Sequence, residues 1–471
     1  MGEASRRRFL VSGKRQKNQL ELAFGGEGRG EAPGVSGEGT EPLAAERGTE
    51  SRESTERLME EVLEGENLRK ALQRVKANKG SPGVDGMTVE QLPGYLERYW
   101  PTHREQLLEG AYRPQAVRRV GIPKPGGGKR KLSVPTVLDR FVQQAVMQVL
   151  QSKWDRTFSG FSFGFRPGRS AHQAVALAQE YVAQGYGWVV DMDLEKFFDS
   201  VNHDMLMARV AKRVSDKRVL KLIRAFLNAG AMEDGLEGPG VEGTPQGGPL
   251  SPLLSNLFLD DLDRELERRG HRFVRYADDC NIYVRTERAG LRVMGSVKAF
   301  LTRKLKLKVN EGKSGVGKAS ERKFLSFRFT AGRELKRGIA PEALGRFKRR
   351  VVELTRRTRG VSLERMVAQL TPYLIGWRNY FGFCQTSSVL RDLDSWTRRR
   401  LRCVAWKQWK RGKNRFTQLR RRGVGKDLAA QTAGSPHGPW RISRSPALSF
   451  ALPNAFLDSL GVPRLTATKT P

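Results

Sequence analysis

Two adjacent aspartates at the tip of an apolar segment are the first residues whose types and spacing could do chemistry. Asp278 and Asp279 stand between two short runs rich in Phe, Val, Ile and Tyr, residues 273–276 and 280–284. This pattern predicts a β-hairpin that carries both carboxylates on its turn. Neighbouring carboxylates repel each other, and their oxygens suit Mg²⁺. The pair therefore favours a divalent-cation site, with an ordinary Asx-rich turn as the alternative.

A second acidic strand upstream strengthens this interpretation. In residues 187–194 the alternation of a β-strand places Asp191 and Asp193 on one face. An acidic strand beside an acidic hairpin is the layout of a two-metal site, in which cations roughly 4 Å apart activate a 3′-hydroxyl and stabilise the leaving pyrophosphate. We therefore predict that Asp193, Asp278 and Asp279 are catalytic and hold two Mg²⁺ ions. Asp191 shares this acidic face, and the alternative is that it only forms a hydrogen bond to the scaffold.

The elements that must position these residues follow from hydrophobic periodicity and turn signals. Strands are expected on both arms of a glycine-rich loop at 125–128, and again at 305–310. Helices are expected at 56–77, 89–109, 136–156, 171–184, from about 203, and at 251–268 and 290–305.

Several blocks, in chain order, resemble one known family. They are Gly-Phe-Arg-Pro-Gly-Arg-Ser at 164–170, Asp193 followed by Phe-Phe-Asp at 197–199, Thr-Pro-Gln-Gly-Gly-Pro-Leu-Ser-Pro at 244–252, and Tyr-Ala-Asp-Asp at 276–279. Together they resemble the group II intron-encoded reverse transcriptase/maturase family, from about residue 57 to 460. Phe-Leu-Ser-Phe at 324–327 resembles the family's primer-gripping block, except that Ser326 replaces the usual glycine.

The resemblance implies an α+β right-hand polymerase fold with fingers, a palm containing an antiparallel sheet, and an α-helical thumb. The first residues, rich in Gly, Glu, Arg and Ser, contain too few apolar side chains to offset the entropy of ordering, so disorder is expected there. The expected divisions are a disordered segment at 1–52, fingers with an N-terminal extension at 53–185, palm at 186–330, thumb and maturase domain at 331–422, and a short nucleic-acid-binding tail at 423–471.

Nucleotide-binding residues are also implied by the resemblance. Lys124 and Arg130 flank the glycine-rich loop and are assigned to the incoming triphosphate, with a solvated basic hairpin as the alternative. Phe198 is placed under the sugar, where its ring would exclude a 2′-hydroxyl, unless it is an ordinary core residue. Gln246 is expected near the nascent base pair or in a structural turn. Lys313 is expected to give a proton to pyrophosphate.

Arginines provide the candidate nucleic-acid contacts. Arg166 and Arg169 precede a predicted helix, where they could anchor a phosphate or instead form salt bridges that staple the loop. Over residues 341–422, 22 Lys and Arg face 5 Asp and Glu, and this imbalance favours a thumb that follows the phosphates of a duplex. Within it, the run Arg398, Arg399 and Arg400 is the most one-sided, while each aromatic ring between the basic residues has a core position as its alternative.

Composition bounds the partners. With 85 Lys and Arg against 50 Asp and Glu, the net charge of +35 indicates a polyanion, and nucleic acid is favoured over membrane. No apolar run is long enough to span a bilayer. Three widely spaced cysteines fit a reducing, cytoplasmic location. Association with the nucleoid is expected when the protein acts on DNA. The cysteines form no zinc-binding pair, so no endonuclease module is expected, and a protein without this module resembles the IIC-like branch of the family.

The predicted function is RNA-directed DNA synthesis joined to a maturase role, in which the protein binds group II intron RNA to assist splicing and mobility. Its partners would be that intron RNA, an RNA template with a DNA primer, dNTPs and a DNA target. Two alternatives stay open. One is a catalytically idle RNA-binding splicing factor, and the other is a reverse transcriptase domesticated for DNA repair or defence.

Overall fold

The central sheet is formed by the two acidic segments of the chain, which lie side by side as antiparallel strands. The computed structural model describes residues 55–466, apart from 124–128, 196, 234–235, 239–246, 333 and 357. The sheet has four strands in the order β6-β7-β3-β8, and every neighbouring pair is antiparallel. They are β3 (Trp188–Met192), β6 (Arg272–Tyr276), β7 (Asp279–Val284) and β8 (Gly315–Lys318).

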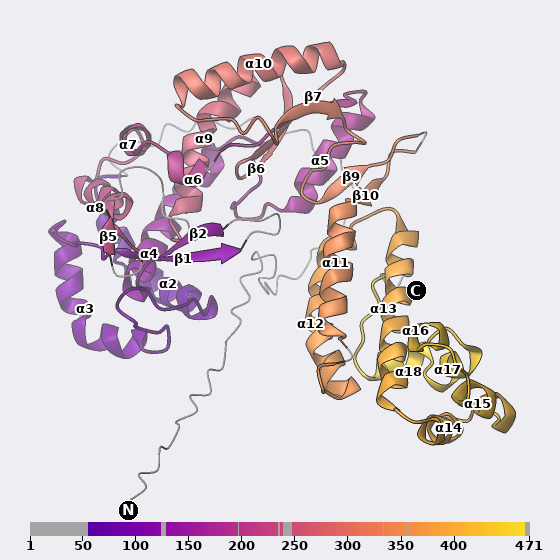
Figure 1. Ribbon diagram of the computed structural model, residues 1–471. Coiled ribbons are helices and arrows are strands. Elements are labelled where there is room, and N and C mark those ends of the chain that lie inside the picture. The colour runs from indigo at the N-terminus through magenta and orange to yellow at the C-terminus, as the bar shows by residue number, and fades with distance from the viewer. Residues whose placement is uncertain are drawn as a thin grey trace, which may run out of the picture. The chain divides into compact units, whose positions relative to one another are not determined.

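One face of this sheet packs on a helix, and the opposite face carries the aspartates. Helix α10 (Glu287–Lys304) packs against β3, β7 and β8. Figure 1 shows α10 above β7. A Cβ atom at Gly290 would lie 2.6 Å from Val316 Cγ1, so glycine permits this close approach of helix and sheet. Since side chains alternate along a strand, Val190 and Val316 share this apolar face and Asp191 points to the other one.

Helices surround the apolar core that the sheet faces, and most agree with their periodicity. The predictions at 136–156, 171–184 and 251–268 are confirmed within two residues. Side-chain caps set two of the starts: the Thr136 hydroxyl accepts from Asp139 N, and Ser170 forms a capping box with Gln173. The helices are α1 (Leu58–Val62), α2 (Gly65–Ala77), α3 (Leu92–Leu108), α4 (Val137–Trp154), the 3₁₀ helix η2 (Asp155–Thr157), α5 (Ala171–Ala183), α6 (Phe197–Ser200), α7 (His203–Ala211), α8 (Lys217–Asn228) and α9 (Ser251–Arg268).

A second sheet contains the two strands predicted around the glycine-rich loop. Strand β1 (Val117–Pro123) pairs antiparallel with β2 (Lys129–Val134), from Arg118 opposite Val134 to Pro123 opposite Lys129. Two short strands not expected from the sequence extend it in the order β2-β1-β4-β5. They are β4 (Ala231–Glu233), which is parallel to β1, and β5 (Leu236–Gly238).

Two expected elements differ from the structure. The helix expected at 56–77 is split into α1 and α2 at Leu63 and Glu64, because Glu64 is extended and starts a new helix. The strand expected at 305–310 is absent from this described stretch, which has one isolated bridge, between Leu194 and Val309. Lys306 has a φ of 54°, and this left-handed conformation interrupts the extended chain. The edge strand is β8 instead.

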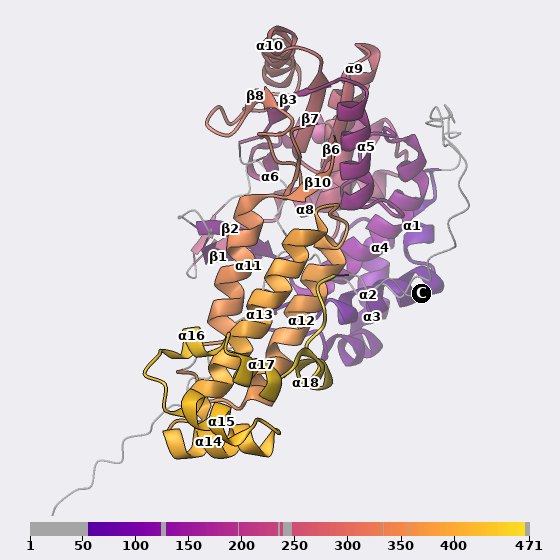
Figure 2. The same ribbon diagram turned by 90° about the vertical axis from the view of Figure 1, so that its right-hand side faces the viewer.

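The described chain divides into two units, residues 55–340 and 341–466. In the second unit three long helices pack in sequence, as predicted for a thumb, and Figure 2 shows them side by side. The residues after 422 are also helical and pack on these helices. The helices are α11 (Pro341–Leu354), α12 (Leu363–Phe381), α13 (Ser387–Gln408), α14 (Gly412–Arg421), α15 (Lys426–Ala433), α16 (Pro439–Ile442), α17 (Pro446–Ala451) and α18 (Asn454–Ser459).

No helix in the described ranges is both long and apolar enough to cross a membrane.

The serine that replaces the family's glycine sits in a strained turn. Phe324 and Phe327 exchange backbone hydrogen bonds of 2.9 Å, and between them Leu325 and Ser326 have φ values of 49° and 65°. Positive φ at both central positions is the type I′ pattern, which glycine adopts without the side-chain penalty. The turn therefore forms with serine, at a cost in backbone strain. It precedes the two-stranded pair β9 (Phe327–Phe329) and β10 (Arg337–Ile339).

We predict that Ser326→Gly stabilises the protein by about 1 kcal/mol, because it removes the left-handed strain of a residue with a Cβ atom. Ser296→Gly, within helix α10, is the matched control and should lose about 0.5 kcal/mol. Urea unfolding followed by circular dichroism measures both. Equal destabilisation by the two changes would show that the turn stores no strain.

Candidate active site

The paired aspartates lie on a two-residue hairpin turn, as the sequence predicted. Tyr276 pairs with Asp279 across β6 and β7, which leaves Ala277 and Asp278 as the loop. Ala277 has a φ of 57°, the conformation that a type II′ turn requires at its first loop position and that glycine usually supplies. Ala277 directly precedes Asp278, and a strained non-glycine residue beside candidate catalytic residues is typical of functional sites.

The register of the central sheet brings the third predicted aspartate to this turn. Met192 of β3 lies opposite Cys280 of β7. One step further along the same antiparallel register, Asp193 faces Asp279. Residues separated by 86 positions are thus neighbours because two strands pair.

Asp191, Asp193 and Asp279 lie on one face of the sheet, with Asp278 in the turn beside them, and their charges act on each other. Burial and the negative charges of Asp278, Asp191 and Asp193 raise the pKa of Asp279 to about 7. Burial also raises the pKa of Asp191 to about 6, with Arg322 opposing the shift and Asp193 adding to it. The Asp279 residue keeps an exposed surface, so solvent screens part of this repulsion.

Lys313 forms an ion pair with Asp193. Its Nζ lies 3.2 Å from Asp193 Oδ2, and two-thirds of its side chain is exposed. The backbone beside it is tied to the strand end, since Asn310 N donates to Asp193 O at 2.8 Å and Asp193 N donates to Ser314 Oγ at 2.9 Å. The structure therefore places Lys313 beside Asp193, and its role toward pyrophosphate stays a prediction.

The donor set of this face suits a hard divalent cation. It consists of carboxylates, which Mg²⁺ prefers, and they repel each other in the absence of an ion. Within the described ranges no three His, Cys, Asp or Glu side chains stand close enough together to enclose a metal ion as they lie. Binding would therefore require the side chains of Asp193, Asp278 and Asp279 to be drawn inward.

A buried arginine behind the turn holds it in place. Arg275 of β6 forms a double hydrogen bond with the carboxylate of Asp263 in α9, at 2.7 and 2.6 Å, and both side chains are almost fully buried. Its Nη1 donates to Ala277 O at 2.8 Å and to Asn256 Oδ1 at 3.1 Å. The helix, the strand and the strained loop residue thus share one guanidinium.

The Gly-Phe-Arg-Pro-Gly block supports the same turn. A Cβ at Gly164 would lie 2.3 Å from Ala277 N, so only glycine lets the two backbones approach this closely. Asn256 Nδ2 donates to Gly164 O at 2.8 Å. Sequence reasoning missed Arg275, Asp263 and Asn256 as a supporting set, although an arginine inside an apolar strand was the available signal.

Arg166 has a structural position, in favour of the loop-stapling alternative. It is buried, pairs with the carboxylate of Asp155 at 2.8 Å, and donates to the carbonyls of Ser159 and Ser162. A guanidinium occupied in this way is not available as a phosphate anchor. Arg169 is half-buried, donates to Gly160 O at 2.6 Å and lies over an aromatic ring.

The predicted nucleotide-binding residues differ in how far the structure describes them. Phe198 is half-buried, whereas its neighbour Phe197 is buried, so Phe198 is the ring of the pair that could meet a sugar. Lys124 and Gln246 lie outside the described residues, as does the segment 1–52. Arg130 is described only by its backbone, in β2.

The side chains of Arg398, Arg399 and Arg400 in α13 mostly contact other residues of the second unit. Arg398 is buried and forms ion pairs with Asp394 at 2.8 Å and Asp458 at 2.7 Å. Arg399 lies 4.0 Å from the ring centre of Trp440, and Arg400 donates to Thr355 Oγ1. The burial of Arg398 argues against its predicted contact with nucleic acid and favours a role in joining α13 to α18.

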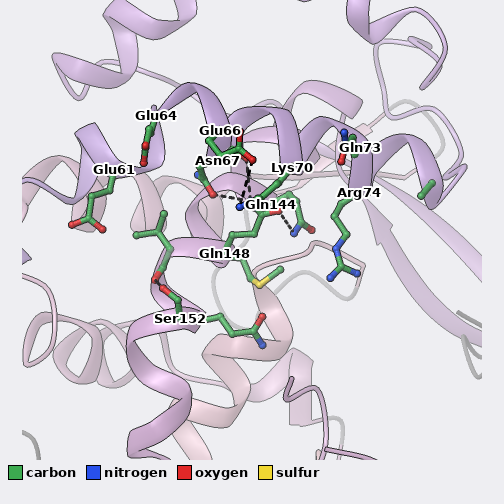
Figure 3. A pocket seen from close by; sticks show the side chains of 14 residues that line it. Glu61, Glu64, Glu66, Asn67, Lys70, Gln73, Arg74, Gln144, Gln148 and Ser152 are labelled. Atoms are coloured by element: carbon green, nitrogen blue, oxygen red, sulfur yellow. Dashed lines mark hydrogen bonds and ion pairs between the residues drawn. The ribbon is translucent and has the colours of Figure 1, made fainter. Parts of the chain in front are cut away.

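A pocket of about 650 Å³ between α2 and α4 contains none of the predicted site residues (Figure 3). Its amide side chains bond to each other: Gln148 Nε2 donates to Asn67 Oδ1 at 2.7 Å, and Gln144 Nε2 donates to Gln148 Oε1 at 3.0 Å. These contacts join the two helices, so the pocket is part of the packing between them.

Comparisons with known proteins match two parts of the chain to known families. Residues 122–329 match the family described as "Reverse transcriptase (RNA-dependent DNA polymerase)", and residues 344–423 match "Group II intron, maturase-specific domain". The chain is 37% identical over 233 residues to Protein YkfC of Escherichia coli K12, covering 48% of this chain and 61% of that protein. It is 36% identical over 195 residues to the group II intron-encoded protein LtrA of Lactococcus lactis subsp. cremoris, covering 41% and 32%.

A third relative is a 91 kDa protein in the cob intron of Schizosaccharomyces pombe, 37% identical over 185 residues, covering 39% of this chain and 22% of that protein. The chain therefore spans less than two thirds of the length of each of these three relatives.

We predict that Arg275→Leu lowers the free energy of unfolding by about 3–5 kcal/mol, because it leaves the Asp263 carboxylate buried without a partner. Arg224→Leu is the control, since its pair with Asp204 is exposed and should contribute less than about 1 kcal/mol. Denaturant unfolding measures both. Comparable losses for the two variants would contradict the role of the buried pair.

We also predict that Asp279→Asn stabilises the metal-free protein at pH 8 by roughly 2 °C in Tm, and not at pH 4. The folded-state pKa lies above the usual aspartate value, so the folded protein binds this proton more tightly, and stability is lost as pH rises toward 7. Asparagine removes that loss. Thermal unfolding in EDTA at both pH values measures the effect, and a pH-independent difference would refute it.

Proposed function

We propose that the chain is an RNA-directed DNA polymerase that also binds group II intron RNA to assist splicing and mobility. It carries a reverse transcriptase domain followed by a group II intron maturase-specific domain, and so belongs with the group II intron-encoded proteins. Its substrates are dNTPs and an RNA template with a DNA primer, and its product is inserted at a DNA target. The observation that supports the proposal is the pairing of β3 with β7, which sets Asp193 and Asp279 on the same face of the sheet, with Asp278 in the turn beside them.

These three aspartates would hold two Mg²⁺ ions. When bound, the ions would lower the pKa of the primer hydroxyl and neutralise charge on the leaving pyrophosphate. The raised pKa of Asp279 supports this assignment, because burial and neighbouring carboxylates both favour a bound cation there.

The surrounding residues have roles that need no ion. Lys313 can keep its ammonium within reach of the pyrophosphate oxygens, since its side chain is largely exposed beside Asp193. Phe198, half-exposed next to the acidic strand, can exclude a 2′-hydroxyl by contact with the sugar. Lys124, Arg130 and Gln246 remain proposed nucleotide contacts on the evidence of the sequence.

Net charge supports a nucleic-acid substrate. The value of +35 for the chain favours binding of a phosphate backbone. Such binding weakens as the salt concentration rises, because releasing counterions into a more concentrated salt solution gains less entropy. The maturase role rests on the second domain, residues 344–423, and on the intron-encoded relatives.

We predict that Asp278→Asn lowers primer extension on an RNA template by more than about a hundredfold, because metal ligands contribute more than the residues behind them. Asp261→Asn is the control: this aspartate is exposed on α9 and pairs with Arg209. Incorporation of labelled dNTP in the presence of Mg²⁺ measures the rate.

The same proteins separate the enzyme from a catalytically idle splicing factor. Binding of intron RNA, measured by filter retention, should be unchanged in Asp278→Asn. Wild-type protein that binds intron RNA yet extends no primer would overturn the polymerase assignment and leave the splicing role.

A further inference from the structure

An arginine that belongs to none of the predicted motifs lies across the edge strand of the acidic sheet. In the pairing of β3 with β8, Asp191 is opposite Gly315 and Val189 is opposite Gly317. Paired residues of antiparallel strands point to the same face, so both glycines lie on the face that carries the aspartates. Arg322 fills the space that their missing side chains leave.

The fit between this arginine and the two glycines is close. A Cβ atom at Gly315 would lie 2.3 Å from Arg322 Nη2, and one at Gly317 would lie 3.0 Å from Arg322 Nε. Both distances are shorter than ordinary contact. The arginine side chain therefore lies flat along the strand, and only glycine at position 315 lets the guanidinium occupy this place.

A tight turn starts the side chain in the right direction. Arg322 N and Glu321 N both donate to Lys318 O, the last carbonyl of β8, at 3.1 and 2.9 Å. From there Arg322 runs back over its own strand, and its Nη1 reaches 3.9 Å from Asp191 Oδ2. Nη2 lies 3.5 Å from Val316 O. These contacts are long, and a partly exposed ion pair of this kind contributes little by itself. The glycine groove, and not the ion pair, fixes the position.

We infer that Arg322 is a positioning residue for the reaction proposed above: seated over Gly315 and Gly317, it supplies a resident positive charge that keeps Asp191 aligned beside Asp193 and Asp279. The inference rests on the proposed polymerase function. It assigns Asp191 to the scaffold of the site and explains why the edge strand has glycine at two alternate positions.

The physical need for such a charge follows from crowding. Asp191, Asp193, Asp278 and Asp279 act on each other as like charges. Lys313 faces Asp193, at the outer end of the strand, whereas Arg322 faces Asp191 one alternation deeper. Without Arg322, the negative charge of Asp191 would repel the carboxylates of Asp193 and Asp279 and displace them. Small displacements of catalytic groups are expensive, with about 1 Å reducing rates roughly a hundredfold.

The test compares Arg322→Gln with Gly315→Ala, which keeps the arginine but displaces its guanidinium. Both variants should lower kcat for primer extension about tenfold, with KM for primer–template within about twofold of wild type. Arg322→Lys should recover part of the loss, because it restores charge without the planar fork. Gly312→Ala is the control, since its added Cβ would meet only Asn310 Oδ1, at 3.6 Å.

A second measurement does not depend on activity. The increase in Tm on adding Mg²⁺ to metal-free protein should be larger in Arg322→Gln than in wild type, because the ion then replaces the missing positive charge. A double-mutant cycle adds Asp191→Asn. If Arg322 acts through Asp191, the two losses in kcat are less than additive, because asparagine removes the repulsion that the arginine opposes.

Each outcome decides the matter. Wild-type kcat and wild-type Mg²⁺ response in both Arg322→Gln and Gly315→Ala would overturn the inference. A raised KM for primer–template at unchanged kcat would assign Arg322 to nucleic-acid contact instead. Additive losses in the cycle would separate it from Asp191. Should Arg322→Gln fail to fold, Gly315→Ala and Arg322→Lys carry the same comparison. Inactive wild-type protein would count against the polymerase function, while the Mg²⁺ response would still test Arg322.

Discussion

The active-site face depends on one buried ion pair, between Arg275 and Asp263. Removing both charges from water has a large unfavourable free energy, and it is recovered only when the geometry is good and the remaining donors are satisfied. Here both conditions hold, since two parallel hydrogen bonds join the pair and the third guanidinium nitrogen donates to Asn256 and to Ala277 O. The pair therefore does more than stabilise. Its hydrogen bond to Ala277 O ties helix α9 and strand β6 to the turn, in which Ala277 has the left-handed φ of 57°.

A balance of charge on two scales follows from this arrangement. The chain as a whole is strongly basic, yet Asp191, Asp193 and Asp279 share one face of the central sheet, with Asp278 in the turn beside them. Two cations, Lys313 beside Asp193 and Arg322 beside Asp191, offset part of that negative charge. Burial, together with the charges of Asp278, Asp191 and Asp193, raises the pKa of Asp279 to about 7. Carboxylates crowded in this way suit a divalent cation.

Arginine is the residue whose role the chain order discloses least. Arg166, Arg275, Arg322 and Arg398 all occur among other cations or apolar residues, and nothing local separates a buried staple from a phosphate contact. In the structure Arg166, Arg275 and Arg398 pair closely with carboxylates. The sequence separation of these pairs runs from 4 residues, for Arg398 and Asp394, to 60 residues, for Arg398 and Asp458. Arg322 lies in a groove of two glycines. The planar guanidinium with its five donors can pair with a buried carboxylate or with a phosphate. The burial of each arginine and its partner in the fold therefore decide which of the two roles it has.

Local physics was enough to predict the acidic hairpin, the strand leading to Asp193 and the bounds of the helices α4, α5 and α9 from the sequence, because alternation, periodicity and turn chemistry act over a few residues. The resemblance to a known family added the order of the parts. What only the tertiary structure decided are the long-range choices: the register that sets Asp193 against Asp279, the strand that starts at Gly315 after the left-handed Lys306, and the partners of each arginine. Such choices depend on which distant segments pack together, and packing is a property of the folded chain as a whole.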